Sequence, residues 1–170
     1  MKTVSISLDA GGGRFIAEGT HRGQVIHVNA PKAEAEESRR PTGFSASELL
    51  LASAGACTAW DVLEMMRKRR HELTVLDVAV DGVQDEAAPW PYRQIALHFR
   101  LHGSGLRPRV VERVIRLACV RYCAVLATVR GVAQISATME LVDGEGSSSG
   151  RLPVDLNGVP AAPDEAMDRP

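Results

Sequence analysis

The segment 49–60 contains no charged residue, and this constrains the fold more than any other feature of the chain. It follows Ser45-Ala46-Ser47-Glu48, which fits a capping box with Ser45 as the N-cap and Glu48 as the reciprocal acid. The predicted helix runs from residue 46 to about residue 70 and ends in four cations, which favour a helix C-terminus. Because a helix that is apolar on every side does not lie on a surface, we expect 49–60 to be buried all round.

Alternation of apolar and polar residues predicts strands on both sides of this helix, and therefore an α+β fold. The other expected elements are a β-meander from strands 4–8, 14–18 and 24–29, an antiparallel pair from strands 73–82 and 92–102 with one wet face, a second helix over 108–129, and a last strand over 132–142. We therefore expect one domain over 1–142. Residues 143–170 are rich in Gly, Ser, Pro and Asp, so we expect a disordered C-terminal tail there.

Composition removes several classes of function. The net charge is −1 and only 4% of residues are aromatic, so neither electrostatic attraction to nucleic acid nor a base-stacking platform is expected. No uninterrupted apolar run reaches the ~18 residues that span a bilayer, and the N-terminus lacks the basic and apolar regions of a secretory signal. Three cysteines are an odd number without the spacing of a disulfide framework, so a cytoplasmic, reducing location is expected.

The three cysteines are the residues to which the sequence most readily assigns chemistry. Cys57 lies in the uncharged helix between small residues, and Cys119 and Cys123 lie four residues apart on the apolar face of the second helix. They fit either of two interpretations: small core residues, or a redox pair in which one thiolate becomes a sulfenic acid and a second thiol closes a disulfide. The pattern alone leaves both open.

A metal site is the weakest interpretation. Cys119, Cys123, His98 and His102 lie at short spacings, but one C-x-x-x-C pair without a second pair is a weak zinc pattern, so we expect no metal. The glycine-rich phosphate and dinucleotide motifs and the G-x-S-x-G motif are absent from the sequence, and no organic cofactor is expected.

The segment GFSASELLLASAGACTAWDVLEMMRKRR, followed by a β-hairpin and then by a helix containing RYCAVLATV, resembles the OsmC/Ohr superfamily. The order of elements is similar over roughly 4–142. The resemblance implies an intertwined homodimer in which antiparallel sheets wrap around two long central helices, with active sites at the dimer interface. ELLLASAGACTAWDV and RYCAV resemble the YhfA-like branch of that superfamily most closely.

The characterised branches of that superfamily reduce organic hydroperoxides with a peroxidatic cysteine and a resolving cysteine. The resemblance implies the peroxidatic role for Cys57 and the resolving role for Cys123. It also implies a catalytic Arg from the N-terminal strands, for which Arg22 is the match, and a Glu ten residues before the peroxidatic cysteine. Ser47 stands at that spacing here, and Glu48 is nine residues before Cys57.

The sequence therefore predicts a thiol-dependent peroxidase that reduces small organic hydroperoxides through a Cys57 sulfenic acid. Cys123 would resolve it as a disulfide, a cellular dithiol would reduce the disulfide, and Cys119 would be a core residue. Besides Arg22, the loop residues Arg39 and Arg40 are candidates for the cation that activates the thiol. The alternative is a non-catalytic or weakly catalytic stress-response or binding dimer with an apolar pocket between its helices, which the missing Glu favours.

Overall fold

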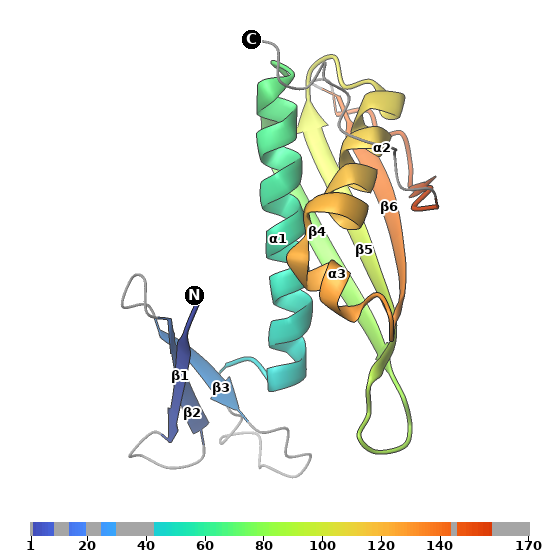
Figure 1. Cartoon of the computed structure of the whole chain (residues 1–170). Helices are drawn as coiled ribbons and strands as arrows, with labels where there is room; N and C mark the ends of the chain where they lie inside the picture. The colour runs from blue at the N-terminus through green and yellow to red at the C-terminus, as the bar shows by residue number, and fades with distance from the viewer. Residues whose placement is uncertain (1, 9–13, 20–24, 30–42, 144–145, 158–170) are drawn as a thin grey trace. The chain divides into compact units, whose positions relative to one another are not determined.

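The computed structural model describes residues 2–8, 14–19, 25–29, 43–143 and 146–157, and it confirms a mixed α+β architecture (Figure 1). We expected one domain over 1–142. The contacts divide the chain into two units, Met1–Leu50 and Leu51–Pro170, and each unit is described by itself below.

The first unit is the predicted β-meander followed by the start of the long helix. Its antiparallel sheet consists of β1 (Val4–Leu8), β2 (Arg14–Gly19) and β3 (Val25–Asn29), in that order. Helix α1 (Ala46–Lys68) begins with the predicted capping box. The Ser45 backbone N–H donates to Glu48 Oε2 over 2.7 Å, and the Glu48 N–H donates to Ser45 Oγ over 3.2 Å. The sequence signal for this helix start is therefore confirmed.

The second unit contains a four-stranded sheet. Its strands, in spatial order, are β4 (Leu73–Gln84), β5 (Tyr92–Gly103), β6 (Gln134–Val142) and β7 (Leu152–Val154). The β4–β5 pair is antiparallel as predicted, but β5 and β6 run parallel. The expectation of antiparallel sheets is therefore confirmed except at this pair. Helices connect the end of β5 to the start of β6. Such a crossover returns the chain to the end of the sheet at which β5 begins, so the two strands run in the same direction.

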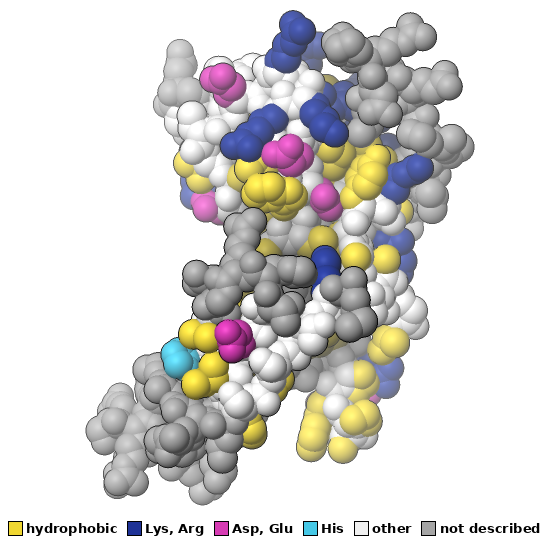
Figure 2. All heavy atoms as spheres, turned by 60° about the vertical axis from the view of Figure 1, so that its left-hand side comes forward, with side chains coloured by type: hydrophobic (Ala, Val, Ile, Leu, Met, Phe, Trp, Pro, Cys, Tyr) yellow, Lys and Arg dark blue, Asp and Glu magenta, His cyan; other side chains and the backbone are white. Residues whose placement is uncertain are grey.

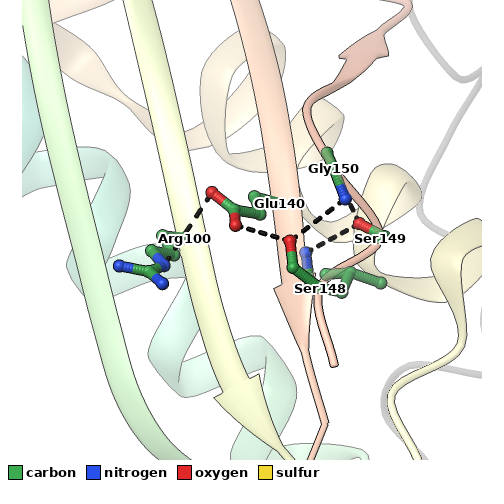
Figure 3. Close-up of polar contacts among 6 residues, drawn as sticks. Arg100, Glu140, Ser148, Ser149 and Gly150 are labelled. Carbon is green, nitrogen blue, oxygen red and sulfur yellow. Dashed lines mark hydrogen bonds and ion pairs between the residues drawn. The ribbon is translucent and has the colours of Figure 1, made fainter. Parts of the chain in front are cut away.

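Strand β7 lies inside the stretch that we expected to be a disordered tail. It pairs with β6 and buries Val154, so that expectation is wrong for Leu152–Val154, while 158–170 lie outside the described residues. Side chains fasten the preceding turn to β6 (Figure 3): Ser148 Oγ donates to Glu140 Oε1 over 2.6 Å, and the Leu141 N–H donates to Ser149 Oγ over 3.0 Å. Hydrogen bonds from short polar side chains therefore hold this turn against β6, in addition to the burial of Val154.

The second helix is not continuous as we expected. It consists of α2 (Pro108–Leu117), a five-residue π-helical turn η2 (Ala118–Tyr122) and a short helix α3 (Ala124–Val129). Between the last two, Cys123 has an extended backbone with φ −69° and ψ 106°, and its N–H donates to the Ala118 carbonyl over 2.9 Å. Helix α1 is therefore long, with 23 residues, whereas the expected second long helix is interrupted.

Helices α1, α2 and α3 lie over one face of the four-stranded sheet (Figure 1). Alternate residues of β5 point into this layer and are buried, namely Ile95, Leu97, Phe99 and Leu101. Gly55 of α1 is part of the close approach to β4, because a Cβ added there would lie 2.9 Å from Val80 Cγ2. The small residues around Cys57 thus let the helix lie close to the sheet.

Helix α1 is only half covered, so the expectation that it is buried all round is wrong for the single chain. Ala54, Val62 and Met66 are fully buried, whereas Trp60 is 64% exposed. Figure 2 turns this side toward the viewer and shows hydrophobic side chains at the surface near a group of Lys and Arg side chains. Length and composition alone would allow α1 to cross a membrane, but core helices of water-soluble proteins meet the same criteria, and its buried face packs as a core helix does.

Candidate active site

The structure brings together the two cysteines that the sequence singled out. Cys57 comes from the middle of α1 and is half-buried, while Cys123 comes from the break between η2 and α3 and is 2% exposed. An interaction with the Cys57 side chain helps to raise the pKa of the Cys123 thiol, and all three cysteines of the chain are free. Two residues that are 66 positions apart in the sequence therefore lie close to each other.

The break in the second helix is what orients Cys123. As the N-cap of α3, its sulfur accepts a hydrogen bond from the Leu126 N–H over 3.4 Å. In an uninterrupted helix this backbone N–H would be bonded to a carbonyl and the cysteine side chain would have no capping role. The π-helical turn before it inserts the extra residue that ends the regular ladder, as such turns often do at functional sites.

Burial sets the protonation of two of the thiols. It raises the pKa of Cys123 to about 11, assisted by the interaction with Cys57 and opposed by the N–H of Leu126. Burial also raises the pKa of Cys119 to about 12, with smaller contributions from Cys123 and Asp61. Both groups are therefore neutral thiols near pH 7, which suits a resolving residue and a core residue better than an attacking nucleophile.

Two charged residues near the thiols were not among the predicted site residues. Asp61, one turn after Cys57, acts electrostatically on Cys119 and has a buried Oδ2 atom without a hydrogen-bond partner among the described residues. Its spacing of four residues from Cys57 on a predicted helix was a usable signal in the sequence. Arg130 donates to the carbonyls of Cys119 over 2.7 Å and Val120 over 3.1 Å, and no sequence pattern indicated this.

The other predicted site residues are not brought to the thiols by any described contact. Arg22, Arg39 and Arg40 lie outside the described residues. Glu48 is engaged in the helix cap, where hydrogen bonds from the Ser45 backbone and hydroxyl lower the pKa of its carboxyl group. The Ser47 hydroxyl lies 3.2 Å from that of Ser45. Their catalytic roles therefore stay predictions.

The four residues weighed for metal binding do not form one group. His98 lies on β5, where one ring nitrogen is 2.8 Å from Thr138 Oγ1 and the other is 3.0 Å from Asp81 Oδ2. The cysteines lie in the helical layer. Across the described ranges, no cluster of three or more His, Cys, Asp or Glu side chains has the arrangement of a metal site.

The fold and the facing thiols define a class of α+β protein that carries one cysteine on a long helix and a second at a break in the following helix. Residues 37–138 match the family model described as OsmC-like protein, so the chain belongs to the OsmC-like family. Within it, the chain falls in the YhfA-like branch: it is 31% identical to Protein YhfA of Escherichia coli K12 over 98 residues, which are 58% of this chain and 73% of that protein.

Solved structures agree on the fold. A hypothetical protein from Aquifex aeolicus VF5 matches with a TM-score of 0.71 and 22% identity, covering 84% of this chain and 97% of that one. The organic hydroperoxide resistance protein OhrB of Bacillus subtilis matches with a TM-score of 0.56 and 15% identity, covering 82% and 97%. Identities this low support the architecture only. Family membership itself suggests a peroxide-related stress protein.

Proposed function

We propose that the chain is a thiol-dependent peroxidase that reduces small organic hydroperoxides. The observation that carries this proposal is the proximity of the Cys57 and Cys123 thiols, since two free thiols close together on separate helices are what a sulfenic acid and its resolving thiol require. OhrB of Bacillus subtilis, an organic hydroperoxide resistance protein, has the same fold.

In the proposed reaction the Cys57 thiolate attacks the terminal oxygen of the hydroperoxide. An S–O bond forms, the O–O bond breaks, and the alkoxide leaves with a proton as an alcohol. The Cys123 sulfur then attacks the Cys57 sulfenic acid, an S–S bond forms and water leaves. A dithiol reductant, available in the reducing compartment that the sequence indicates, restores both thiols.

The roles of the two cysteines follow from their surroundings. Cys123 has a raised pKa and is almost fully buried, so it reaches a partner sulfur but not a solvent-borne substrate. Cys57 is half-buried and is the more accessible of the pair. The cation that stabilises its thiolate is proposed to be Arg22, and Glu48 would orient that cation only after leaving its bonds to Ser45.

We further propose that the protein works as a homodimer. The exposed side of α1 is apolar, with Trp60 64% exposed and Ala52 and Ala56 also exposed. A second copy would cover this stripe, because large aromatic side chains on a helix face are typical of interfaces. Sedimentation-equilibrium analysis should give twice the 18.3 kDa chain mass, and Trp60→Glu should shift the protein toward the monomer.

A binding or weakly catalytic dimer is the second candidate. The observation that favours it is the engagement of Glu48 with Ser45, because the Glu of the characterised peroxidases would then be unavailable for an Arg. Such a protein would keep the fold and an apolar space between its helices, but it would consume hydroperoxide slowly.

One experiment separates the two candidates. Fully reduced protein is mixed with one equivalent of cumene hydroperoxide, and free thiols and intact mass are followed in time. The peroxidase predicts rapid loss of two thiols and a Cys57–Cys123 disulfide. Cys57→Ser should abolish consumption, Cys123→Ser should accumulate a sulfenic acid, and the matched control Cys119→Ala should behave as wild type. Consumption no faster than that of a free small thiol would contradict the peroxidase and favour the binding dimer.

A further inference from the structure

A cavity of about 360 Å³ lies beside the π-helical turn, and none of the three cysteines is among its lining residues. Its walls come from η2, the residue after α3, the start of β6 and the segment after β7, all in the second unit. The apolar part of the lining consists of Val120, Ala133, Ile135 and Leu156. Sites for small molecules have volumes of about 300–1,000 Å³ and mostly apolar linings with a few polar groups. The cavity therefore has the size and the apolar surface that a small ligand requires.

The cavity is also lined by a cation that has no carboxylate partner. The Arg130 guanidinium donates to the carbonyls of Cys119 over 2.7 Å and of Val120 over 3.1 Å, and both of these acceptors are neutral. No Asp or Glu of the described residues forms an ion pair with Arg130, whereas Arg93 pairs with Asp85 over 2.6 Å. A guanidinium has five N–H groups, and Arg130 uses two of them in these bonds. Its positive charge and its other donors are therefore left for a ligand.

Two side-chain amides supply further donors at the cavity. Gln134 is the first residue of β6, Asn157 follows β7, and both are exposed lining residues. Within the described ranges neither side-chain amide forms a hydrogen bond, and the bond of Asn157 to Asp155 comes from its backbone N–H. The lining contains no Asp or Glu among the described residues. A guanidinium and two amides without an acid attract an anion and offer no charge to neutralise a cation.

We propose that this cavity binds a small organic carboxylate. The ligand's carboxylate bonds to Arg130, because the planar donors of a guanidinium match the two oxygens of a carboxylate. Its compact apolar body lies against the apolar lining, of which Val120 and Leu156 are half-buried in the free protein. The site goes beyond the proposed peroxidase and does not depend on it, since no cysteine lines the cavity.

Benzoate is a suitable probe, because it combines a carboxylate with a compact apolar ring. Benzamide has nearly the same shape without the charge, and inorganic phosphate has the charge without the ring. Each compound is titrated into reduced, isotope-labelled protein, and the backbone amide resonances are followed by nuclear magnetic resonance. We expect saturable benzoate binding with the largest shifts around Val120, Ala133 and Leu156. Benzoate should bind at least about tenfold more tightly than benzamide or phosphate, since only benzoate uses both the cation and the apolar lining.

The variants test the role of the guanidinium. Arg130→Met should weaken benzoate binding about tenfold or more, because a charge-assisted hydrogen bond is lost. Since this variant also loses the bonds to the η2 carbonyls, Gln134→Glu is the second variant: it keeps Arg130 and adds a negative charge at an exposed lining position. It should weaken benzoate binding about fivefold. Arg100→Met is the matched control, because it removes the same charge from a residue outside the lining, and it should leave the affinity unchanged.

Three results would overturn the carboxylate site. These are benzoate binding no tighter than that of benzamide or phosphate, shifts centred away from the lining residues, and full affinity in both Arg130→Met and Gln134→Glu. Each of them would leave the peroxidase intact, because thiol oxidation by cumene hydroperoxide is measured separately and without benzoate.

Discussion

The two faces of the four-stranded sheet carry different kinds of polar group. On the open face, Thr138, His98 and Asp81 form a hydroxyl–imidazole–carboxylate chain in which both ring nitrogens are paired. In the helical layer on the other face, Cys57 and Cys123 lie close to each other, and Asp61 has a buried carboxyl oxygen without a hydrogen-bond partner among the described residues. The open-face chain contains residue types familiar from hydrolases, but its Asp81 side chain is 76% exposed.

The comparison shows that burial and the presence of hydrogen-bond partners determine how strongly a side chain interacts more than its residue type does. Water weakens the electrostatic interactions of an exposed pair and stabilises every charged form, so the open-face residues act mainly as cross-strand contacts. In the helical layer, burial shifts the pKa of a side chain strongly, as the pKa of about 12 for Cys119 indicates. Perturbed groups of this kind concentrate at functional sites.

The largest expected effect is a loss of stability of the reduced protein in alkali. The pKa of Cys119 is about 12 in the folded chain against 9.0 for a free thiol. A folded-state pKa above the unfolded one gives stability that is fully present below pH 9 and is lost as the pH rises toward 12. Each pH unit in this window costs up to about 1.4 kcal/mol for this thiol, so Cys119 alone should account for a loss of about 2 kcal/mol by pH 10.5.

Urea unfolding in the presence of a reductant, at pH 8 and pH 10.5, measures this loss. Cys119→Ala is the matched control, because it removes the thiol and keeps a small apolar side chain. The variant should lose about 2 kcal/mol less than wild type over the same interval. Equal losses in the two proteins would show that Cys119 is not the protonated, buried thiol on which the contrast between the two faces depends.

Much of this architecture was predictable from the sequence. The capping box at Ser45 and the alternation in β4 and β5 predicted their elements closely, because both signals act through neighbours in the chain. The resemblance to the family predicted Cys57 and Cys123 as a pair, and the two side chains lie close to each other in the structure.

Other features depend on distant contacts and could not be predicted. No glycine or proline marks the break at Cys123, and the carbonyl groups before it are capped by Arg130, which is 11 residues after Cys119. Strand β7 depends on hydrogen bonds from serines to β6. The exposed side of α1 looked like core because an apolar segment has the same pattern whether its own chain or a second copy covers it.

A smaller effect is expected for the arginines of the two faces. Arg130 donates two hydrogen bonds, of 2.7 and 3.1 Å, to carbonyls at the end of η2, so Arg130→Met should destabilise the protein by about 1–2 kcal/mol. Arg100 on the open face lies 3.8 Å from Glu140 and is half exposed, so Arg100→Met should cost less than about 0.5 kcal/mol. Chemical unfolding at pH 7 compares them, and equal costs would contradict the distinction between the faces.

The smallest effect is expected for the open-face chain itself. Asp81→Asn keeps the shape of the side chain and removes the charge next to His98. Because Asp81 is 76% exposed, solvent already screens its charge, and the variant should unfold within about 0.5 kcal/mol of wild type. It should also consume cumene hydroperoxide at the wild-type rate. A loss of peroxide consumption in Asp81→Asn would show that the exposed chain, and not only the buried thiols, belongs to the reactive part of the molecule.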